Sequence, residues 1–271
     1  MKFCGGDDIV DYNLLLGEGT HGVVYGSLIS PTIAVKLFNL KHCHDIKSGE
    51  YAMHEYVHDQ FEKFKNHIDK NLVDYVFVPQ VYGFKYLPNS QNPSCCMYYM
   101  DQLKPLYNHI IQLSFNYPRD ANMILSSGQY VGIDTLKSFG FNNQDVSMIN
   151  RSIASMMALF HYAMKIDAYD IEYVLARHGH AHGVYAIDYD KVNVYQNDTT
   201  IVRKLTENDT ETRVIKNELD LSRLLSTSIH YCPHILYPEY QEWKWTYIDM
   251  AKKFKHEKLA QLVMEQYEKY F

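Results

Sequence analysis

The sequence predicts an α+β protein in two parts: a small antiparallel β-sheet with one helix, followed by a mostly helical part. Short apolar or aromatic runs separated by turn residues fill the first hundred residues, as in a β-meander. Longer segments with apolar residues at helical spacing dominate the remainder. A chain of 271 residues is also long enough for one large core or two lobes. We expect the two parts to be residues 1–102 and 103–271.

Five strands and one helix are expected in the first part. The helix follows the third strand, has apolar residues near helical spacing, and has Ser48 or Gly49 as its cap. The last two strands lie on either side of a polar turn. The strands are expected at 8–16, 22–29, 32–38, 75–87 and 94–103, and the helix at 48–64.

The second part contains the clearest helix of the chain, at 142–165, whose apolar residues share one face. A pair of strands is expected at 171–177 and 183–195, on either side of a histidine-rich turn. The other expected elements are helices at 105–115, 217–229 and 242–270, and a polar β-hairpin within 193–216.

Composition places the chain among ordinary globular proteins. A net charge of −6 argues against wrapping nucleic acid, which requires a basic stripe. No apolar run approaches the roughly 20 residues that span a bilayer, and the N-terminus lacks the apolar region of a signal peptide. The cysteines are odd in number and lack metal-site spacing, so we expect reduced thiols and an intracellular, cytoplasmic protein without nucleic-acid or membrane partners. The five cysteines are Cys4, Cys43, Cys95, Cys96 and Cys232.

A glycine-rich turn at 16–26, LGEGTHGVVYG, is the first functional candidate. Gly17, Gly19 and Gly22 match G-x-G-x-x-G, which in a dinucleotide-binding fold would open a helix. Here β-branched and aromatic residues at 23–25 follow the last glycine and favour a strand. The turn is therefore expected to be a β-hairpin, whose glycines serve either positive φ alone or a close approach of backbone to a phosphate.

Lys36 lies in the middle of the next strand, TIAVKLF. Strand alternation places Ala34 and Lys36 on one face, where an ammonium among apolar residues needs an opposite charge. The small Ala34 leaves room for a flat ring, and the ammonium could meet phosphate oxygens. Glu50 and Glu55 of the following helix are the candidate carboxylate partners, and we choose Glu55 because it lies in the middle of the helix.

These segments resemble the protein kinase fold. LGEGTHGVVY is similar to its nucleotide-covering loop, IAVK to its lysine strand and Glu55 to the helix partner of that lysine. YYMDQL is similar to a hinge, with Met100 near the gatekeeper position and Asp101 to Leu103 offering backbone groups to adenine. The resemblance implies a bilobal kinase-like fold that binds ATP with Mg²⁺. The nucleotide-binding residues that it implies are Gly17, Gly19, Gly22, Val24, Ala34, Lys36, Glu55, Met100, Asp101 and Leu103.

The second part resembles the catalytic half of that fold. After a long helix ending in ALFH, Asp167 and Glu172 have the spacing of the catalytic aspartate and metal-binding asparagine of the family. AIDYDK is similar to D-F-G, with Asp188 as principal metal ligand. Asp167 or Asp170 would act on the acceptor hydroxyl, and spacing leaves both open. Asp188 and Glu172 would bind Mg²⁺, because carboxylate oxygens suit it and gathered carboxylates otherwise repel one another.

Several features depart from the protein kinases. Ile166 stands where the family has arginine, Asp190 where D-F-G has glycine, and no A-P-E sequence follows. A closer resemblance, from about the hinge to Val192, is to an uncharacterised kinase-like family best known from fungal genomes. The prediction is an ATP-dependent phosphotransferase acting on a protein Ser/Thr hydroxyl. A pseudokinase that acts as a nucleotide-binding or protein-interaction scaffold, and a small-molecule kinase, are the alternatives.

Two further features have plain explanations. On a single strand, His178, His180 and His182 of RHGHAHG would share a face and could form a zinc site. We favour a polar hairpin tip instead, because no fourth ligand is apparent. Trp243 and Trp245 of the last helix are expected in the core.

Overall fold

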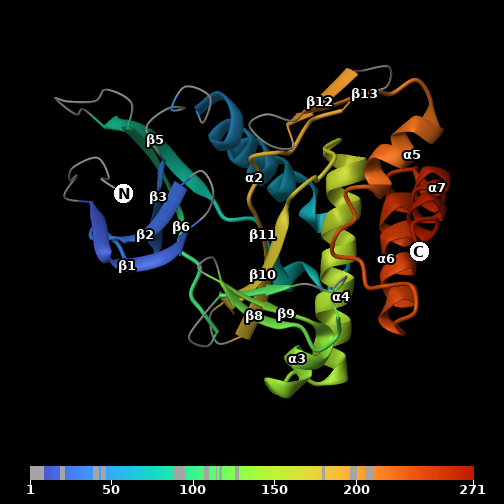
Figure 1. Cartoon of the computed structure of the whole chain (residues 1–271), viewed down its shortest axis with the longest axis horizontal. Coiled ribbons are helices and arrows are strands. Elements are labelled where there is room, and N and C mark those ends of the chain that lie inside the picture. Colours follow the sequence, from blue (N-terminus) through green and yellow to red (C-terminus); the bar gives the residue numbers. More distant parts are fainter. Residues whose placement is uncertain are drawn as a thin grey trace.

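The computed structural model contains a β-sheet part and a mostly helical part (Figure 1). This confirms the predicted α+β class, and the arrangement is consistent with a bilobal kinase-like fold. The structure describes residues 9–18, 22–38, 43, 47–87, 95–106, 110–113, 115, 118–125, 128–178, 181–195, 200–204 and 210–271.

The first part is a five-stranded antiparallel sheet. In spatial order its strands are β1 (Val10–Glu18), β2 (Gly22–Ser27), β3 (Ile33–Phe38), β6 (Cys95–Asp101) and β5 (Val81–Leu87). β1 and β2 form the hairpin predicted from the glycine-rich turn, and Gly17 pairs with Val24. Gly22 suits its position because a Cβ there would lie 2.5 Å from the carbonyl oxygen of Leu37 on β3.

A π-helical turn, η1 (Lys47–Tyr51), leads from the sheet into α2 (Ala52–Phe64), which buries Val57 and Phe61 in the main core. Before this turn, Cys43 forms a disulfide with Cys96 of β6. The expectation that all cysteines are reduced is therefore wrong for this pair. The two cysteines are 53 residues apart, and only the return of β6 alongside β3 brings them together.

Replacement of both disulfide cysteines by alanine is expected to lower the free energy of unfolding. A closed loop of this length restricts the unfolded chain by about 4 kcal/mol in the chain-entropy account. Urea unfolding of the Cys43→Ala/Cys96→Ala variant under oxidising conditions measures the loss, and wild-type protein in a reducing buffer should match the variant. Cys232→Ala, at the free buried thiol, is the matched control. Equal stability of wild type with and without reductant would contradict the bond.

The second part contains a six-stranded mixed sheet. In spatial order its strands are β4 (Val76–Phe77), β11 (Ala181–Ile187), β10 (Glu172–His178), β7 (Ile111–Leu113), β9 (Gly128–Val131) and β8 (Asn122–Leu125). β10 and β11 form the predicted strand pair. The single strand expected at 75–87 is two strands in different sheets, because β4 pairs with β11 of the second sheet and β5 pairs with β6 of the first. Pro79 lies between them and lacks a backbone N–H for a sheet hydrogen bond.

Helices cover the second sheet and extend away from the first (Figure 1). They are α3 (Ile133–Ser138), α4 (Asn143–Ala158), the π-helical turn η4 (Leu159–Ala163), α5 (Glu218–Ser226), α6 (Glu239–Lys253) and α7 (Glu257–Glu268). α4 begins at a capping box, in which Asn142 accepts from backbone N–H groups and Asp145 accepts from the backbone of Asn142. The helices share one large apolar core with the second sheet.

Several sequence expectations need correction. The helix expected at 105–115 is wrong, because 111–113 form the strand β7. The helix expected at 242–270 is two helices that break near Lys255, which has a φ of 65°. Trp243 is buried as expected, whereas Trp245 is 57% exposed. The predicted polar hairpin is present as β12 (Thr200–Lys204) and β13 (Thr210–Val214). Within the described residues, no helix combines the length and apolarity needed to cross a membrane.

Candidate functional site

Three polar side chains, Lys36, Glu50 and Tyr98, form a network on one face of the first sheet. Nζ of Lys36 on β3 is 2.5 Å from Oε1 of Glu50 in η1. Tyr98, which pairs with Lys36 across β3 and β6, donates its hydroxyl to the same oxygen at 2.8 Å. The Glu50 side chain is 3% exposed and that of Lys36 is 15% exposed. The ammonium is therefore held in one position, as the strand pattern predicted, but by a different carboxylate.

The choice of Glu55 as partner of Lys36 was wrong. Glu55 is exposed on α2 and interacts with the hydroxyl of Tyr51. Glu55 is five positions after Glu50, which in a regular α-helix corresponds to a rotation of about 140° around the axis. One face cannot hold both side chains, and the π-helical turn directs Glu50 toward β3.

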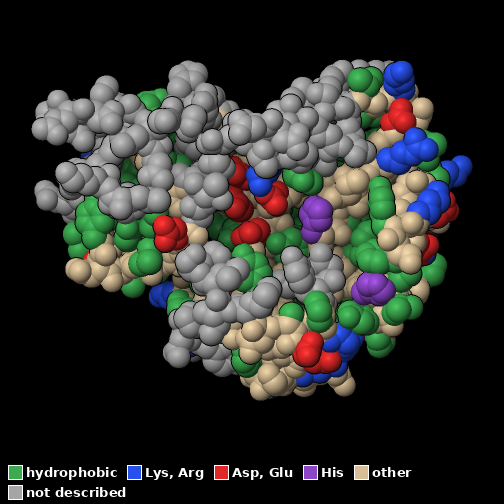
Figure 2. All heavy atoms as spheres, in the orientation of Figure 1, with side chains coloured by type: hydrophobic (Ala, Val, Ile, Leu, Met, Phe, Trp, Pro, Cys, Tyr) green, Lys and Arg blue, Asp and Glu red, His purple; other side chains and the backbone are tan. Residues whose placement is uncertain are grey.

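The charges around Lys36 come from both parts of the chain. Burial lowers the pKa of Lys36, but the carboxylates of Glu50, Asp188 and Asp190 outweigh this effect and raise it overall. Lys36 therefore stays protonated. Asp188 and Asp190 follow β11 in the second part, so Lys36 of the first part interacts with acids of the second. We call the place where Lys36 and Glu50 meet these acids the junction. Figure 2 shows acidic side chains gathered near the middle of this face, beside a basic one.

The acids of this junction repel one another. Burial and the neighbouring Asp188 raise the pKa of Glu172 to about 7, although a hydrogen bond from Gln112 acts to lower it. Burial, Asp188 and Glu50 raise the pKa of Asp190 to about 7. Burial also raises the pKa of Asp188, which has an unusual φ of 63°. A bound cation would relieve this repulsion.

The donor set suits a cation that arrives with phosphate. Among the residues that the structure describes, no group of three or more His, Cys, Asp or Glu side chains is arranged to hold a metal. Asp188 and Glu172 are a pair of hard oxygen donors. Mg²⁺ binds in this manner, through one or two carboxylates, with water and substrate phosphates completing its octahedron.

Asp167 and Asp170 occupy different environments. Asp167 is fully buried and accepts hydrogen bonds from N and Nδ2 of Asn193, at 3.0 and 3.1 Å, and from N of Tyr169 at 3.2 Å. Asp170 is 43% exposed, has a φ of 65° and forms an ion pair with Lys191. Asp167 fastens the loop to the segment after β11, while Asp170 offers its carboxylate to the surface.

The predicted nucleotide-binding positions of the sheet are only partly described. Gly17 and Val24 face each other in the β1–β2 hairpin, and among the described residues other than its chain neighbours none lies within 4 Å of a Cβ placed on Gly17. Gly19 lies outside the described residues. Ala34 is buried and pairs with Met100 on β6, so both lie on the face of Lys36 and Tyr98.

The end of β6 and the residues that follow it contact both sheets. The carboxylate of Asp101 accepts from N of Gln80 at 2.8 Å and from the hydroxyl of Tyr82. Leu103 packs against the apolar surface of Val174 and Tyr185 on the second sheet. This segment therefore connects the two sheets.

Comparisons with known proteins leave the assignment to the chain's own geometry. No protein-family model matches the chain, and no curated protein matches it. Similarity to solved structures extends to 49 chains. One is WaaP in complex with acyl carrier protein, at 10% identity over 95% of this chain and 88% of that chain, with a TM-score of 0.42. A likeness this distant assigns no activity.

His54 is a buried residue of the site that the sequence pattern did not single out. Its Nε2 donates to the carbonyl oxygen of Pro79 at 2.8 Å, and its ring packs against Tyr98 and Tyr189. Burial lowers its pKa to about 4. The only sequence signal is its position on the inner face of α2, three residues before Val57.

Acid is expected to destabilise the protein through His54. Because its pKa is lower in the folded than in the unfolded state, the folded form binds fewer protons. Its contribution is complete above pH 6.5, and about 3 kcal/mol is lost as the pH falls to 4. Urea unfolding of wild type and His54→Gln at several pH values measures this, and the variant should show a flatter profile. Exposed His67→Gln is the control, and a wild-type slope in His54→Gln would contradict the assignment.

The histidine-rich segment is a hairpin tip, as favoured. Its register pairs His178 with Ala181 and Arg177 with His182, which places His178 and His182 on opposite faces. His178 stacks on Phe77, whereas His182 lies against other rings. The expectation of a shared face is wrong because the turn separates the two residues. His180 lies outside the described residues.

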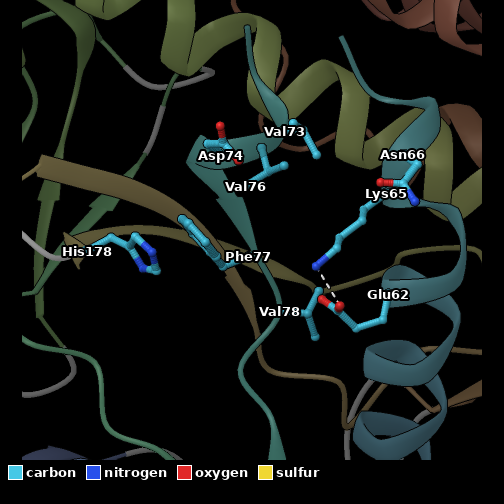
Figure 3. Close-up of a pocket in the computed structure, with 9 residues that line it drawn as sticks. All are labelled: Glu62, Lys65, Asn66, Val73, Asp74, Val76, Phe77, Val78 and His178. Carbon is cyan, nitrogen blue, oxygen red and sulfur yellow. Dashed lines mark ion pairs between the residues drawn. The ribbon is translucent and has the colours of Figure 1, made fainter. Parts of the chain in front are cut away.

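A pocket of about 410 Å³ lies at the opposite end of α2 from Glu50 (Figure 3). Its apolar side is formed by the β4 segment, where Phe77 stacks on both His178 and Tyr185. On the other side Lys65 pairs with Glu62 at 2.5 Å. None of its lining residues belongs to the Lys36–Glu50 network.

Proposed function

We propose that this chain is a phosphotransferase of the protein kinase-like superfamily, which transfers the γ-phosphoryl group of ATP to a hydroxyl. The observation that carries the proposal is the Lys36–Glu50–Tyr98 network facing Asp188 and Asp190. A fixed ammonium beside repelling carboxylates matches the charge of nucleotide phosphates with a divalent cation. Transfer of a phosphoryl group requires positioning and charge stabilisation more than covalent chemistry from the protein.

The residues of the first part would bind the nucleotide. The β1–β2 hairpin, with Gly17 and Gly22, would cover the phosphates, and Gly19 is proposed with them. Lys36 would donate to the α- and β-phosphate oxygens while Glu50 holds it in place. Ala34 and Met100 would border the adenine ring, with backbone groups from Asp101 to Leu103 at its edge.

The residues of the second part would act on the transferred group. Asp188 and Glu172 would hold Mg²⁺, which supplies neutralisation of the phosphate charge when bound. Asp170 would accept the proton of the acceptor hydroxyl, because its carboxylate is exposed at the junction. Asp167 would position this loop through Asn193 rather than contact the acceptor.

A two-stage experiment tests the proposal. Thermal melting with and without MgATP asks whether nucleotide binds, and label transfer from γ-labelled ATP asks whether chemistry follows. Protein Ser/Thr acceptors and a panel of hydroxyl-bearing metabolites are offered in parallel. Binding without transfer would support the scaffold alternative, and labelled metabolite would identify a small-molecule kinase. A protein whose melting is unchanged by MgATP would contradict the whole proposal.

A further inference from the structure

Lys191 is the cation that the second part of the chain contributes to the junction. It directly follows the Asp188–Asp190 segment, and its Nζ forms an ion pair with Oδ2 of Asp170. The Lys191 side chain is 28% exposed and that of Asp170 is 43% exposed, so solvent reaches the pair.

Lys191 and Lys36 share the same acidic neighbours. Burial lowers the pKa of Lys191, but Asp170, Asp190 and Asp188 raise it overall. Asp188 and Asp190 also act on Lys36, which the first part holds through Glu50. The two ammonium groups therefore interact with a common pair of carboxylates, Asp188 and Asp190. Buried Glu50 holds Lys36, whereas Lys191 pairs with the partly exposed Asp170.

The ion pair of Lys191 is of the kind that exchanges readily. Partly exposed pairs contribute only about 0–1 kcal/mol, and lysine has a flexible stem with three rotatable donors. A phosphate group carries more negative charge than the single carboxylate of Asp170. An incoming nucleotide phosphate would therefore compete successfully for this ammonium.

We propose that Lys191 is a catalytic residue of the junction: its ammonium covers Asp170 in the nucleotide-free protein and donates to the transferring phosphoryl group once ATP binds. The inference rests on the proposed function. It assigns Lys191 two positions, and the move between them frees Asp170 for the acceptor hydroxyl.

The proposed transfer needs only ATP and the acceptor hydroxyl as reactants. The acceptor oxygen bonds to the γ-phosphorus while the bond from this phosphorus to the β,γ-bridging oxygen breaks. The electron pair of the broken bond stays on the bridging oxygen of ADP, and the hydroxyl proton passes to Asp170. Lys191 donates hydrogen bonds to the phosphoryl oxygens throughout and neither gains nor loses a proton.

Transfer kinetics and MgATP affinity of three variants test the inference. Lys191→Met should lower kcat by about 100-fold, the effect of removing one transition-state donor, with a much smaller change in MgATP affinity. Lys191→Arg should recover part of the loss, since it keeps the charge. Lys244→Met is the matched control, because Lys244 pairs with Glu268 at 2.5 Å with 22% exposure, within the helical part.

A readout independent of transfer is Mn²⁺ affinity of the nucleotide-free protein. Loss of the Lys191 charge beside Asp188 and Asp190 should tighten Mn²⁺ binding several-fold, and Lys244→Met should not. Wild-type transfer with an unchanged kcat in Lys191→Met would overturn this inference and leave the proposed function standing. A wild-type protein that binds no MgATP would overturn the proposed function and the inference with it.

Discussion

Replacement of Glu50 by glutamine is expected to lower phosphotransfer by about 100-fold or more, because Lys36 loses the carboxylate that holds its ammonium. Glutamine keeps the size of the side chain but cannot neutralise the lysine. Glu55 lies five positions later, exposed on α2, so the rate of Glu55→Gln should stay within about twofold of wild type. Initial rates with MgATP, read by label transfer, compare the two variants.

Melting temperatures separate the effect of Glu50→Gln on stability from its effect on transfer. Glu50→Gln alone leaves a largely buried ammonium without its counter-charge, which is costly. The double variant Lys36→Met/Glu50→Gln removes both charges, so its melting temperature should lie closer to wild type than that of Glu50→Gln. It should nevertheless show no stabilisation by MgATP. Equal rates in Glu50→Gln and Glu55→Gln would remove the Lys36–Glu50 pair from the mechanism.

Local sequence patterns predicted the features whose geometry depends only on residues close in the sequence. Strand alternation placed Lys36 and Ala34 on one face, and the residues after Gly22 indicated a hairpin, because both depend only on neighbouring residues. The partner of Lys36 depends on helix phase, which η1 alters before α2 begins. Glu55 was preferred for its position in the middle of the expected helix, and that position does not determine the direction in which a side chain points.

The sequence alone could not predict features that depend on contacts between distant residues. The Cys43–Cys96 bond requires β6 to return beside β3, and the strand β7 is stabilised by β10 and β9 rather than by its own sequence. Spacing could not separate Asp167 from Asp170, because the difference lies in Asn193, which is 26 residues beyond Asp167 and donates two hydrogen bonds to its carboxylate. Lys191 was missed for the same reason, since its partner is 21 residues away.

The substitution Asp170→Asn is expected to lower transfer by about 100- to 10,000-fold while MgATP still stabilises the protein. The exposed carboxylate of Asp170 would lose its capacity to accept the hydroxyl proton, and removal of a partly exposed ion pair changes stability little. Rates and MgATP-dependent melting, measured on the same preparation, separate chemistry from binding.

The same substitution at Asp167 should give the opposite pattern in stability. Its buried carboxylate accepts from two donors of Asn193 and one of Tyr169, and an amide would turn its own N–H donors toward some of them. Buried donors left without acceptors cost about 1–3 kcal/mol each, so Asp167→Asn should unfold at lower urea concentration than Asp170→Asn. If Asp167→Asn instead kept wild-type stability and lost transfer, while Asp170→Asn remained active, the two roles would be reversed. The loop would then have to open at Asn193 before any acceptor could reach the carboxylate of Asp167.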